Sequence, residues 1–543
     1  MGRRYIFGHG VAMALVANVR AVERPDEIAL RDDQVEMTWG QLNATLNRFV
    51  DGLGRLDLGP QRRVAVFASN SVETVIAHLG GLLAGASTVP INFHLNTDEV
   101  AYILRDSQSA VLFTDAVRYE TAKAAAEISG LESVFCWGQQ LSDGANSAAS
   151  DDADSAASAG PASWEQFLAD SADVEPDGAV APRPNLMYTS GTTGFPKGVD
   201  LPPTIFAGGA TIAEHLQSLA QSRFARYGTH LVVGPMYHTG PLSGMRILAA
   251  GTPIVVMNRF DAEQVLAAVQ AYSVETTVMV PTHFKRLLGL PDLVRNRYDV
   301  RSMKLITHTG SACPIDVKRE MIDWFGPVFM DAYGATEVGT ICLIGSTEWL
   351  EHPGSVGRCV PPFTAVVVDE FDQPVPPGTE GKLYFEDATG RGIVYPNDPE
   401  KTAASHLRPG VFTIGEIGYV DVDGYVYITD RFSDMIVSGG ANIYPAESEH
   451  VLASHPQIAD VAVIGVPDAD MGEAVKALIV AVDPADPPNR ADLEAWCRLH
   501  LAGYKCPRSF DVVSTIGRNA MGKVNKRALR APYWDATQPV ASR

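Results

Sequence analysis

Residues 189–198 read TSGTTGFPKG and combine the residue types of a phosphate-binding loop in an unusual order. A nucleotide-binding P-loop reads G-x-x-x-x-G-K-[ST], and the hydroxyl after its lysine holds magnesium. Here Pro196 takes the second glycine position when Gly191 is taken as the first, and Gly198 follows Lys197 in place of the hydroxyl residue. Glycines let backbone N–H groups approach an anion, while hydroxyls and a lysine add donors and charge. The stretch therefore predicts a phosphate cradle that differs from a P-loop.

Length and charge limit what surrounds this loop. A chain of 543 residues is too long for a single core and predicts two or more domains. The content of 46% hydrophobic and 20% charged residues is ordinary for a globular protein. A net charge of −21 argues against nucleic acid or an anionic membrane as a partner, because phosphate contacts need clustered Lys and Arg. A polyanionic ligand must therefore be held by a local pocket.

Cysteine use and hydropathy predict a cytoplasmic protein without integral membrane association. The six cysteines include no C-x-x-C pair, which disfavours zinc and disulfides and fits a reducing compartment. No apolar run reaches the roughly 18 residues of a membrane span. Residues 1–25 have the basic start and apolar stretch of a signal peptide, but Gly8, His9 and Gly10 interrupt them and no A-x-A site follows. We expect an amphipathic first helix there.

Short apolar runs alternate with helix-like segments over most of the chain. RVAVFAS (63–69) precedes the helical period of 72–86, and KLITHTG (304–310) precedes that of 314–326. This alternation predicts an α/β fold of mainly parallel sheets covered by helices. By contrast, the Ala/Ser/Asp/Gly-rich stretch 142–163 cannot build a core, so we expect a surface insertion there.

The pattern changes after residue 431, where the elements become short. A helix with Pro445 near its first turn and early glutamates is followed by two strands, a second helix and a third strand, SFDVVST (509–515). About 110 residues suffice for a small α+β domain. We predict a large domain, 1–431, with a small β region near its end, and a small domain, 432–543, with the loop 431–441 as the boundary.

Four further stretches carry candidate chemistry. MDAYGATEVG (330–339) offers the ring of Tyr333, the hydroxyl of Thr336 and the carboxylate of Glu337, which suit a nucleobase, an anion and magnesium. A strand-to-helix cap explains the same residues. In 413–431, Glu416 and Arg431 suit ribose hydroxyls. A hairpin built on DVDG is expected there under either interpretation.

The other two stretches are weaker alone. His238 lies in PMYHTGP (235–241), but a lone histidine is more often a core or surface residue than a catalytic one. GRNAMGKVNKR (517–527) contains Lys523 and would ordinarily be a solvated basic loop.

Together, YTSGTTGFPKG, YGATEVG, GYVYITDR with DMIVSGGANIYPAE, and GRNAMGK resemble the ordered signatures of the acyl-adenylate-forming superfamily. That superfamily includes acyl-CoA synthetases, firefly luciferase and peptide-synthetase adenylation domains. The resemblance runs from residue 37 to Lys526. GGANIYPAE with YKCPR (504–508) is similar to the acyl-CoA synthetase branch, and YPNDPEKT (395–402) to ligases for medium, long or steroid-like acyl groups. No carrier-protein or condensation-type segment is seen, so the resemblance implies a stand-alone ligase.

The resemblance implies a reaction with two steps. A carboxylate attacks the α-phosphorus of ATP, giving acyl-AMP and pyrophosphate, and the CoA thiol then attacks the acyl carbonyl and releases AMP. The opening loop would hold the β- and γ-phosphates as the leaving group, whereas a P-loop commonly serves chemistry at the γ-phosphate. The implied ligands are ATP, Mg²⁺, CoA and a carboxylic acid, and a homodimer is left open.

Site residues follow from the resemblance, motif by motif. Catalytic roles fall to Lys523, Thr336, Glu337 and His238, and magnesium to Thr192 and Glu337. ATP or AMP is assigned to Thr189, Ser190, Gly191, Thr192, Thr193, Gly194, Lys197, Gly310, Ser311, Ala312, Asp331, Ala332, Tyr333, Gly334, Thr336, Glu416, Arg431 and Lys523. CoA is assigned to Ser438, Gly439, Gly440 and Lys505. The acyl group is assigned to His238, Thr239, Gly240, His308, Gly334 and Ala335.

Two positions depart from the family pattern, and alternatives stay open. IGE replaces TGD, which puts Glu416 in place of an aspartate, and Ser433 takes the charged hinge position in DRFSD. A nucleotide-binding homologue without catalysis is one alternative, although Lys523 and Glu337 argue against it. A ligase that delivers acyl-AMP to a carrier protein is another. The glycines of the acyl segments suggest room for a long or bulky apolar acid, but packing explains small residues equally well.

Overall fold

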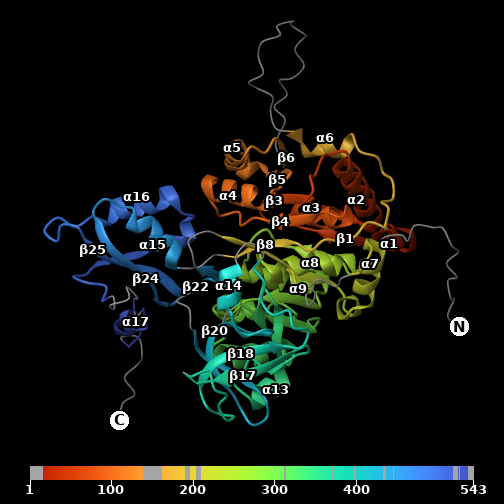
Figure 1. Cartoon of the computed structure of the whole chain (residues 1–543). Helices are drawn as coiled ribbons and strands as arrows, with labels where there is room; N and C mark the ends of the chain where they lie inside the picture. The colour runs from red at the N-terminus through yellow and green to blue at the C-terminus, as the bar shows by residue number, and fades with distance from the viewer. Residues whose placement is uncertain are drawn as a thin grey trace, which may run out of the picture. The chain divides into compact units, whose positions relative to one another are not determined.

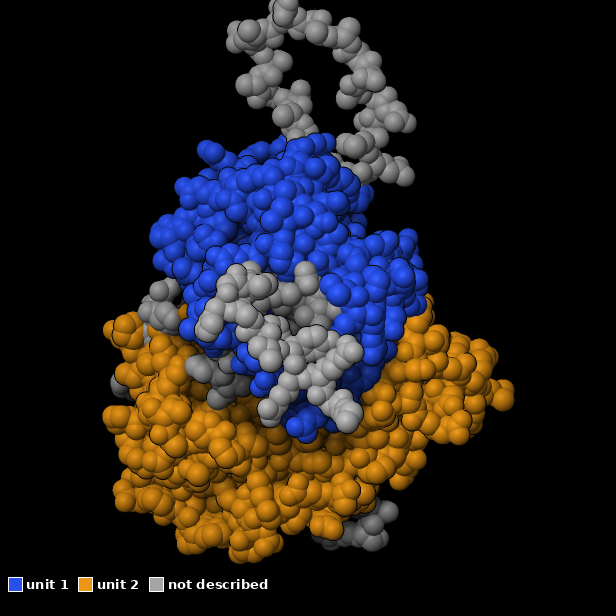
Figure 2. Space-filling model, turned by 90° about the vertical axis from the view of Figure 1, so that its right-hand side faces the viewer, with its two compact units in different colours: residues 1–93, 100–186, 206–259 blue, residues 94–99, 187–205, 260–543 orange. Residues whose placement is uncertain are grey.

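The computed structural model (Figure 1) forms two compact units. The first holds residues 1–93, 100–186 and 206–259, and the second holds residues 94–99, 187–205 and 260–543 (blue and orange in Figure 2). The structure describes residues 16–138, 162–189, 196–202, 209–310, 313–369, 371–395, 399–431, 436–443, 445–517, 524 and 526–535.

The first unit contains a five-stranded parallel sheet in the order β4-β3-β5-β6-β7. Parallel neighbours need crossover connections, and helices α3, α4 and α5 supply them around β3 and β5 (Figure 1). Helix α3 begins after Ser71, whose side chain accepts a hydrogen bond from the Thr74 N–H. The elements are β3 (Arg63–Phe67), α3 (Val72–Leu83), β4 (Ser87–Pro90), α4 (Thr97–Ser107), β5 (Val111–Asp115), η1 (Ala116–Arg118), α5 (Tyr119–Ser129), β6 (Ser133–Trp137), β7 (Ala162–Ser163) and α6 (Trp164–Ala169).

A second group of strands in this unit has β11 between β10 and β1 in parallel, with β2 antiparallel to β1. The sequence pattern of alternating runs and helices accounts for both groups. The elements are α1 (Val16–Glu23), β1 (Ile28–Arg31), β2 (Glu36–Thr38), α2 (Trp39–Gly54), α7 (Ile212–Gln221), η2 (Arg223–Arg226), β10 (His230–Val232), α8 (Thr239–Ala249) and β11 (Ile254–Val256).

Helix α3 carries a buried histidine that makes this unit sensitive to acid. Burial lowers the pKa of His78 to about 3, and its Nδ1 lies 3.0 Å from Thr88 Oγ1. Below the ordinary histidine pKa of about 6.5, the unfolded chain gains a proton that the folded chain does not accept until about pH 3. The stability that the neutral His78 contributes to the unit therefore decreases as pH falls through this window.

We expect His78→Gln to flatten this pH dependence. Between pH 6 and pH 5, the variant should lose roughly 1 kcal/mol less unfolding free energy than the parent, since one histidine costs about 1.4 kcal/mol per pH unit at most. Urea unfolding at both pH values measures the difference. An equal loss in the two proteins would contradict a neutral His78 in the folded state.

The second unit begins with another strand group. β13 pairs in parallel with β12 and β14, and the order then turns antiparallel through β15 and β16. The elements are β8 (Leu186–Thr189), β9 (Lys197–Asp200), α9 (Ala262–Tyr272), β12 (Thr276–Met279), α10 (Pro281–Leu288), α11 (Asp292–Arg295), β13 (Leu305–His308), α12 (Ile315–Phe325), β14 (Phe329–Ala335), β15 (Gly339–Gly345), α13 (Ser346–Glu351) and β16 (Arg358–Cys359).

An antiparallel five-stranded sheet follows, in the order β17-β18-β20-β19 with β21 paired to β20. It is the small β region expected near the end of the large domain. Its inner face forms one apolar cluster with Val199 of β9 and with Ile341 and Cys342 of β15. The elements are β17 (Phe363–Val368), β18 (Gly381–Asp387), α14 (Pro399–Ala404), β19 (His406–Arg408), β20 (Val411–Val420) and β21 (Val426–Arg431).

The C-terminal region has its own sheet, β23-β22-β25-β24 with β26 parallel to β25, and its own buried core. The predicted order of helix, two strands, helix and strand is confirmed, and Pro445 is the first residue of its helix. The elements are β22 (Ile436–Ser438), β23 (Ala441–Ile443), α15 (Pro445–Ala453), β24 (Ile458–Asp468), β25 (Gly472–Ala481), α16 (Arg490–His500), η3 (Gly503–Lys505), β26 (Ser509–Val512) and α17 (Lys526–Asp535).

The predicted fold class is confirmed, with two local corrections. The stretch 330–339 is a strand followed by a turn into antiparallel β15, so the strand-to-helix cap is wrong. The expected boundary loop 431–441 contains β22 and the start of β23. The division at residue 431 stays a prediction. Most of the expected surface insertion, 142–161, lies outside the described residues, and within the described part no helix is long and apolar enough to cross a membrane.

Candidate active site

The opening loop connects two paired strands. Thr189 ends β8, Lys197 begins β9, and the two strands form a two-stranded sheet. A P-loop instead leads from a strand into a helix, so the departures in sequence accompany a different local fold. The predicted phosphate contacts Ser190, Gly191, Thr192, Thr193 and Gly194 lie outside the described residues.

The predicted adenine and phosphate residues lie on adjacent strands. β13 and β14 pair His308 with Asp331, so the turn at Gly310, with φ of +90°, follows beside Ala332 and Tyr333. The Tyr333 ring packs against Phe385 at a centroid distance of 5.8 Å. A Cβ atom at Gly334 would lie 1.9 Å from the Gly339 carbonyl oxygen, which explains the glycine. Ala335 ends β14 and Thr336 opens the turn, while Ser311 and Ala312 lie outside the described residues.

A tyrosine distant in sequence orients the predicted magnesium ligand. Tyr395 Oη donates a hydrogen bond of 3.2 Å to Glu337 Oε1, and Lys401 Nζ lies 3.9 Å from the Tyr395 ring centroid. Mg²⁺ in nucleotide sites commonly takes one or two carboxylates beside the substrate phosphates. The described residues include no cluster of three metal-ligating side chains. The single oriented carboxylate of Glu337 is compatible with such a site, and its role as a magnesium ligand stays a prediction.

A buried ionic group lies beneath these strands. The Asp331 carboxylate pairs with both Lys318 Nζ and His308 Nε2, and Lys318 is 0% exposed. Lys318 Nζ also lies 4.3 Å from the Trp349 ring centroid. Burial lowers the pKa of Lys318, and the Asp331 charge opposes that shift. Sequence reasoning missed Lys318, although it shares a helix face with buried Met321 and Ile322 at helical spacing.

The predicted ribose residues lie at paired positions on two antiparallel strands. Glu416 on β20 is paired directly with Arg431 on β21, and Glu416 is 5% exposed. The expected hairpin over 413–431 is therefore confirmed. Glu416 and Arg431 are therefore neighbours on adjacent strands, and their contact with ribose stays a prediction.

His238 lies in the first unit, where it is the exposed N-cap residue of α8. Thr239 and Gly240 are the first residues of that helix. The Tyr237 ring lies beside the His238 ring, with 4.4 Å between centroids. The other predicted acyl residues described, His308, Gly334 and Ala335, belong to the second unit.

The predicted CoA glycines form the tight turn between β22 and β23. Gly439 and Gly440 have φ of +57° and +84°, which favours glycine. A Cβ atom at Gly439 would lie 2.2 Å from Met471 Cε, and one at Gly440 would lie 3.3 Å from Val280 Cγ2. Ser438 is buried and paired with Ala441. A side chain at Gly439 would collide with Met471 and one at Gly440 would crowd Val280, so packing and the positive φ angles account for both glycines.

Lys505 is a buried ion-pair residue in this structure. Its Nζ lies 2.8 Å from Glu99 Oε1 and 2.7 Å from Glu447 Oε2. Burial alone would lower the pKa of Lys505, but the neighbouring Tyr504, Glu99 and Glu447 raise it above its ordinary value. The ammonium is therefore charged and held by two carboxylates, and its assignment to CoA stays a prediction. The predicted hinge residue Ser433 and the predicted catalytic residue Lys523 lie outside the described residues.

The cysteine near the adenine turn is not an activated nucleophile. Burial raises the pKa of Cys313 to about 12. Because the thiolate is the reactive form, Cys313 is protonated at neutral pH.

Known proteins match this arrangement over nearly the whole chain. A family model described as AMP-binding enzyme matches residues 18–390, and one described as AMP-binding enzyme C-terminal domain matches residues 447–523. The fatty acid--[acyl-carrier-protein] ligase ScoC of Streptomyces coeruleorubidus is 31% identical, over 92% of this chain and 92% of its own.

Two further matches join acids to CoA by name. The 3-[(3aS,4S,7aS)-7a-methyl-1,5-dioxo-octahydro-1H-inden-4-yl]propanoyl:CoA ligase of Rhodococcus jostii is 32% identical, over 92% of this chain and 95% of its own. The structure of a double mutant of o-succinylbenzoate CoA synthetase from Bacillus subtilis, bound to a product analogue, has a TM-score of 0.76 at 26% identity. That alignment includes 95% of this chain and 98% of the other.

Proposed function

Since the chain belongs to the AMP-binding enzyme family and is an AMP-forming acid–thiol ligase, we propose that it joins a medium- or long-chain fatty acid, or a bulky apolar acid, to coenzyme A. Family membership confirms the resemblance to acyl-adenylate-forming enzymes. The observation that carries the proposal is the turn after Tyr333, where Tyr395 orients the Glu337 carboxylate next to an aromatic strand end.

In the first step the negatively charged carboxylate approaches the negatively charged triphosphate of ATP. A carboxylate oxygen attacks the α-phosphorus of ATP, the bond to the bridging oxygen breaks, and pyrophosphate leaves with the electron pair. The Thr336 hydroxyl and the Lys197 ammonium are the donors that we assign to this charge, because preorganised donors stabilise charge that develops in a transition state. Glu416 and Arg431 would hold the ribose, so that the α-phosphate is fixed relative to the acid.

In the second step the CoA thiolate attacks the acyl carbonyl and AMP leaves. The similarity of GGANIYPAE and YKCPR to the acyl-CoA synthetase branch, together with the relative named as a CoA ligase, supports CoA as the acceptor. A carrier protein presents the same pantetheine arm as CoA, and the ScoC relative is named for that acceptor. The acceptor is therefore the point on which the two candidate functions differ.

The acid is proposed as apolar and large. The names of the relatives include a fatty acid and a fused-ring propanoate, both of which are apolar acids with more than a few carbons. His238 is a residue of the first unit that we assign to the acid site.

One experiment tests the proposal. Purified protein is incubated with ATP, Mg²⁺ and a panel of acids: acetate, dodecanoate, hexadecanoate, ferulate and 5β-cholanate. We expect pyrophosphate release with the large apolar acids and, after CoA is added, a thioester seen by mass spectrometry. Thioester on a holo carrier protein but not on CoA would favour the carrier ligase. If none of the acids in the panel led to AMP formation, that result would contradict a ligase for apolar acids.

Tyr395→Phe should raise the magnesium requirement without removing adenylation. The variant keeps the ring and its contact with Lys401 but loses the hydrogen bond that orients Glu337, a contact worth about 1 kcal/mol. We expect a roughly five- to tenfold higher Mg²⁺ concentration at half-maximal ATP–pyrophosphate exchange, and weaker binding of MgATP by titration calorimetry.

Glu337→Gln should lower exchange far more at limiting magnesium, because it removes the charge itself. Tyr384→Phe, on β18, is the matched control. An unchanged magnesium dependence in both Tyr395→Phe and Glu337→Gln would place the ion elsewhere.

A further inference from the structure

One buried asparagine in the first unit connects its two strand groups. Asn70 follows β3 and is 2% exposed. Its Nδ2 donates to the carbonyl oxygens of Gly234 at 2.8 Å and Met257 at 3.1 Å, and its Oδ1 accepts from the Met236 N–H at 2.8 Å. Gly234 follows β10 and Met257 follows β11. A single amide therefore fixes the carboxyl ends of two parallel strands.

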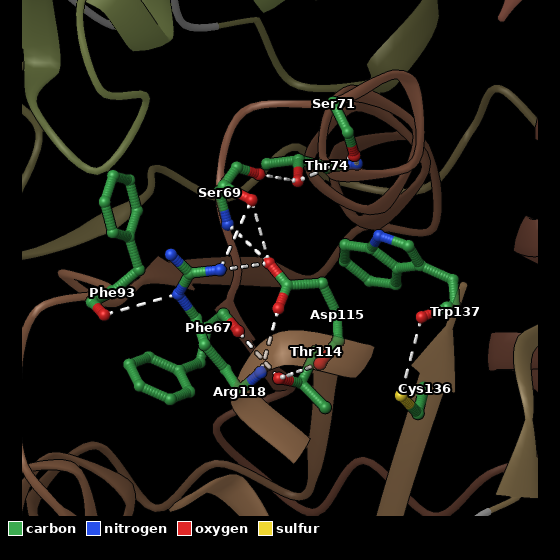
Figure 3. Close-up of polar contacts among 10 residues, drawn as sticks. All are labelled: Phe67, Ser69, Ser71, Thr74, Phe93, Thr114, Asp115, Arg118, Cys136 and Trp137. Carbon is green, nitrogen blue, oxygen red and sulfur yellow. Dashed lines mark hydrogen bonds and ion pairs between the residues drawn. The ribbon is translucent and has the colours of Figure 1, made fainter. Parts of the chain in front are cut away.

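A polar clamp holds the neighbouring residues (Figure 3). The Asp115 carboxylate accepts from the N–H and hydroxyl of Ser69, at 2.8 and 2.9 Å, and from Arg118 Nη1 at 2.6 Å. Arg118 Nε donates to the Phe93 carbonyl oxygen at 3.3 Å, and its guanidinium lies 4.6 Å from the Phe93 ring centroid. The loop after β3 and the Phe93 ring are thus fixed by the same pair of charges.

The Asn70 hydrogen bonds and the Phe93 ring both contact the segment that contains His238. The Phe93 ring meets the Tyr237 ring edge-on at 5.1 Å, and the Tyr237 ring lies 4.4 Å from the His238 ring. From the other direction, Asn70 holds the backbone at Gly234 and Met236. Residues 234–238 are therefore held by backbone hydrogen bonds at one end and by edge-on and tilted ring contacts at the other.

We infer that Asn70 is a positioning residue for His238, acting through the 234–238 backbone, and that it sets how well the acid is held for adenylation. The inference rests on the proposed function, in which His238 lines the acid site. Removing the amide leaves two buried carbonyls and one N–H without their partner, so the segment must shift to find others. A shift of about 1 Å at a reacting group can cost about 10²-fold in rate.

Asn70→Ala is the test, and Asn47→Ala is its matched control. Asn47 is also a buried asparagine of this unit, and its Nδ2 donates to Asp173. We expect Asn70→Ala to raise amide hydrogen exchange in peptides spanning 234–242, with no such rise in Asn47→Ala. This readout needs no substrate. Unchanged exchange in that segment would overturn the inference, whatever the activity.

Kinetics then separate positioning from general damage. With dodecanoate, or 5β-cholanate if that is the acid turned over, kcat/KM for the acid should fall about 10- to 100-fold in Asn70→Ala while KM for ATP changes less than twofold. Equal losses for acid and ATP would indicate a structural role only. If Asn70→Ala does not fold, Phe93→Leu is used instead, because it removes only the contact between the Phe93 and Tyr237 rings. It should lower kcat/KM for the acid selectively, with a fold-change about a tenth of that expected for Asn70→Ala.

A double-mutant cycle identifies the residue through which Asn70 acts. In the His238→Ala background, Asn70→Ala should cause no further loss of activity, so the double variant should be no slower than His238→Ala alone. If His238→Ala alone changes nothing, its proposed role in the acid site fails. If His238→Ala is impaired and Asn70→Ala adds its full loss on top, the positioning inference fails while the proposed function stands.

Discussion

Lys523→Ala is expected to abolish most acyl-AMP formation from ATP while leaving thioester formation from supplied acyl-AMP and CoA nearly intact. From the resemblance of GRNAMGK to the family motif, we propose that this lysine contacts the α-phosphate and the acid carboxylate in the first half-reaction. A carboxylate that approaches a polyanion meets repulsion, which a desolvated ammonium offsets as the bond forms. Loss of one preorganised contact of this kind costs about 10²–10³ in rate.

Both half-reactions are measured on the same purified variant. Arg498→Ala, which removes an exposed cation from α16 of the same C-terminal region, should leave both rates unchanged. A solvated surface lysine predicts no change in either step, and a general structural role predicts parallel losses. Equal impairment of the two half-reactions would contradict the assignment of Lys523 to adenylation alone.

The sheets could be predicted because burial imposes a period on the sequence. Apolar runs such as 63–69 and 304–310, each followed by a helical period, became β3 with α3 and β13 with α12. Local chemistry was less decisive. Thr336 and Glu337 suit a helix cap and a turn equally well, since the same short polar side chains satisfy backbone groups in both. Only pairing with β15 distinguishes them.

The strands found in the expected boundary loop 431–441 could have been predicted from the sequence. The Gly439–Gly440 pair lies between two short apolar runs, which is the pattern of a two-residue hairpin. The flanking strands, β22 and β23, formed where a plain boundary loop was expected.

The contacts that orient the site could not be predicted from spacing. Tyr395 lies 58 residues from Glu337, and Asn70 lies 166 residues from Met236. Both contacts join loops that follow strands of different sheets, and a single sequence does not encode such contacts locally. Motif resemblance supplied the candidate ligands, but the residues that hold those ligands in place follow from tertiary packing.

The second large effect concerns Lys318, whose loss should destabilise the protein strongly. Lys318→Met removes the ammonium that compensates Asp331 in a site where both groups are buried. Removal of one partner from a buried pair typically costs about 3–5 kcal/mol, because the remaining charge is left uncompensated. We expect a large fall in the urea midpoint of unfolding. Lys304→Met is the control, since its pair with Glu275 is more exposed and should contribute at most about 1 kcal/mol.

The cause of the loss is tested by removing the other charge. Asp331→Asn leaves an acceptor for His308 without a charge, so Lys318→Met/Asp331→Asn should recover at least half of the loss of Lys318→Met. The deficit of the single variant should also shrink as pH falls, because an uncompensated buried carboxyl takes up a proton in the folded state more readily than in the unfolded chain. A deficit that is constant with pH and unrelieved by Asp331→Asn would show that Lys318 stabilises the helix by packing against Trp349, and that the charge pair contributes nothing measurable.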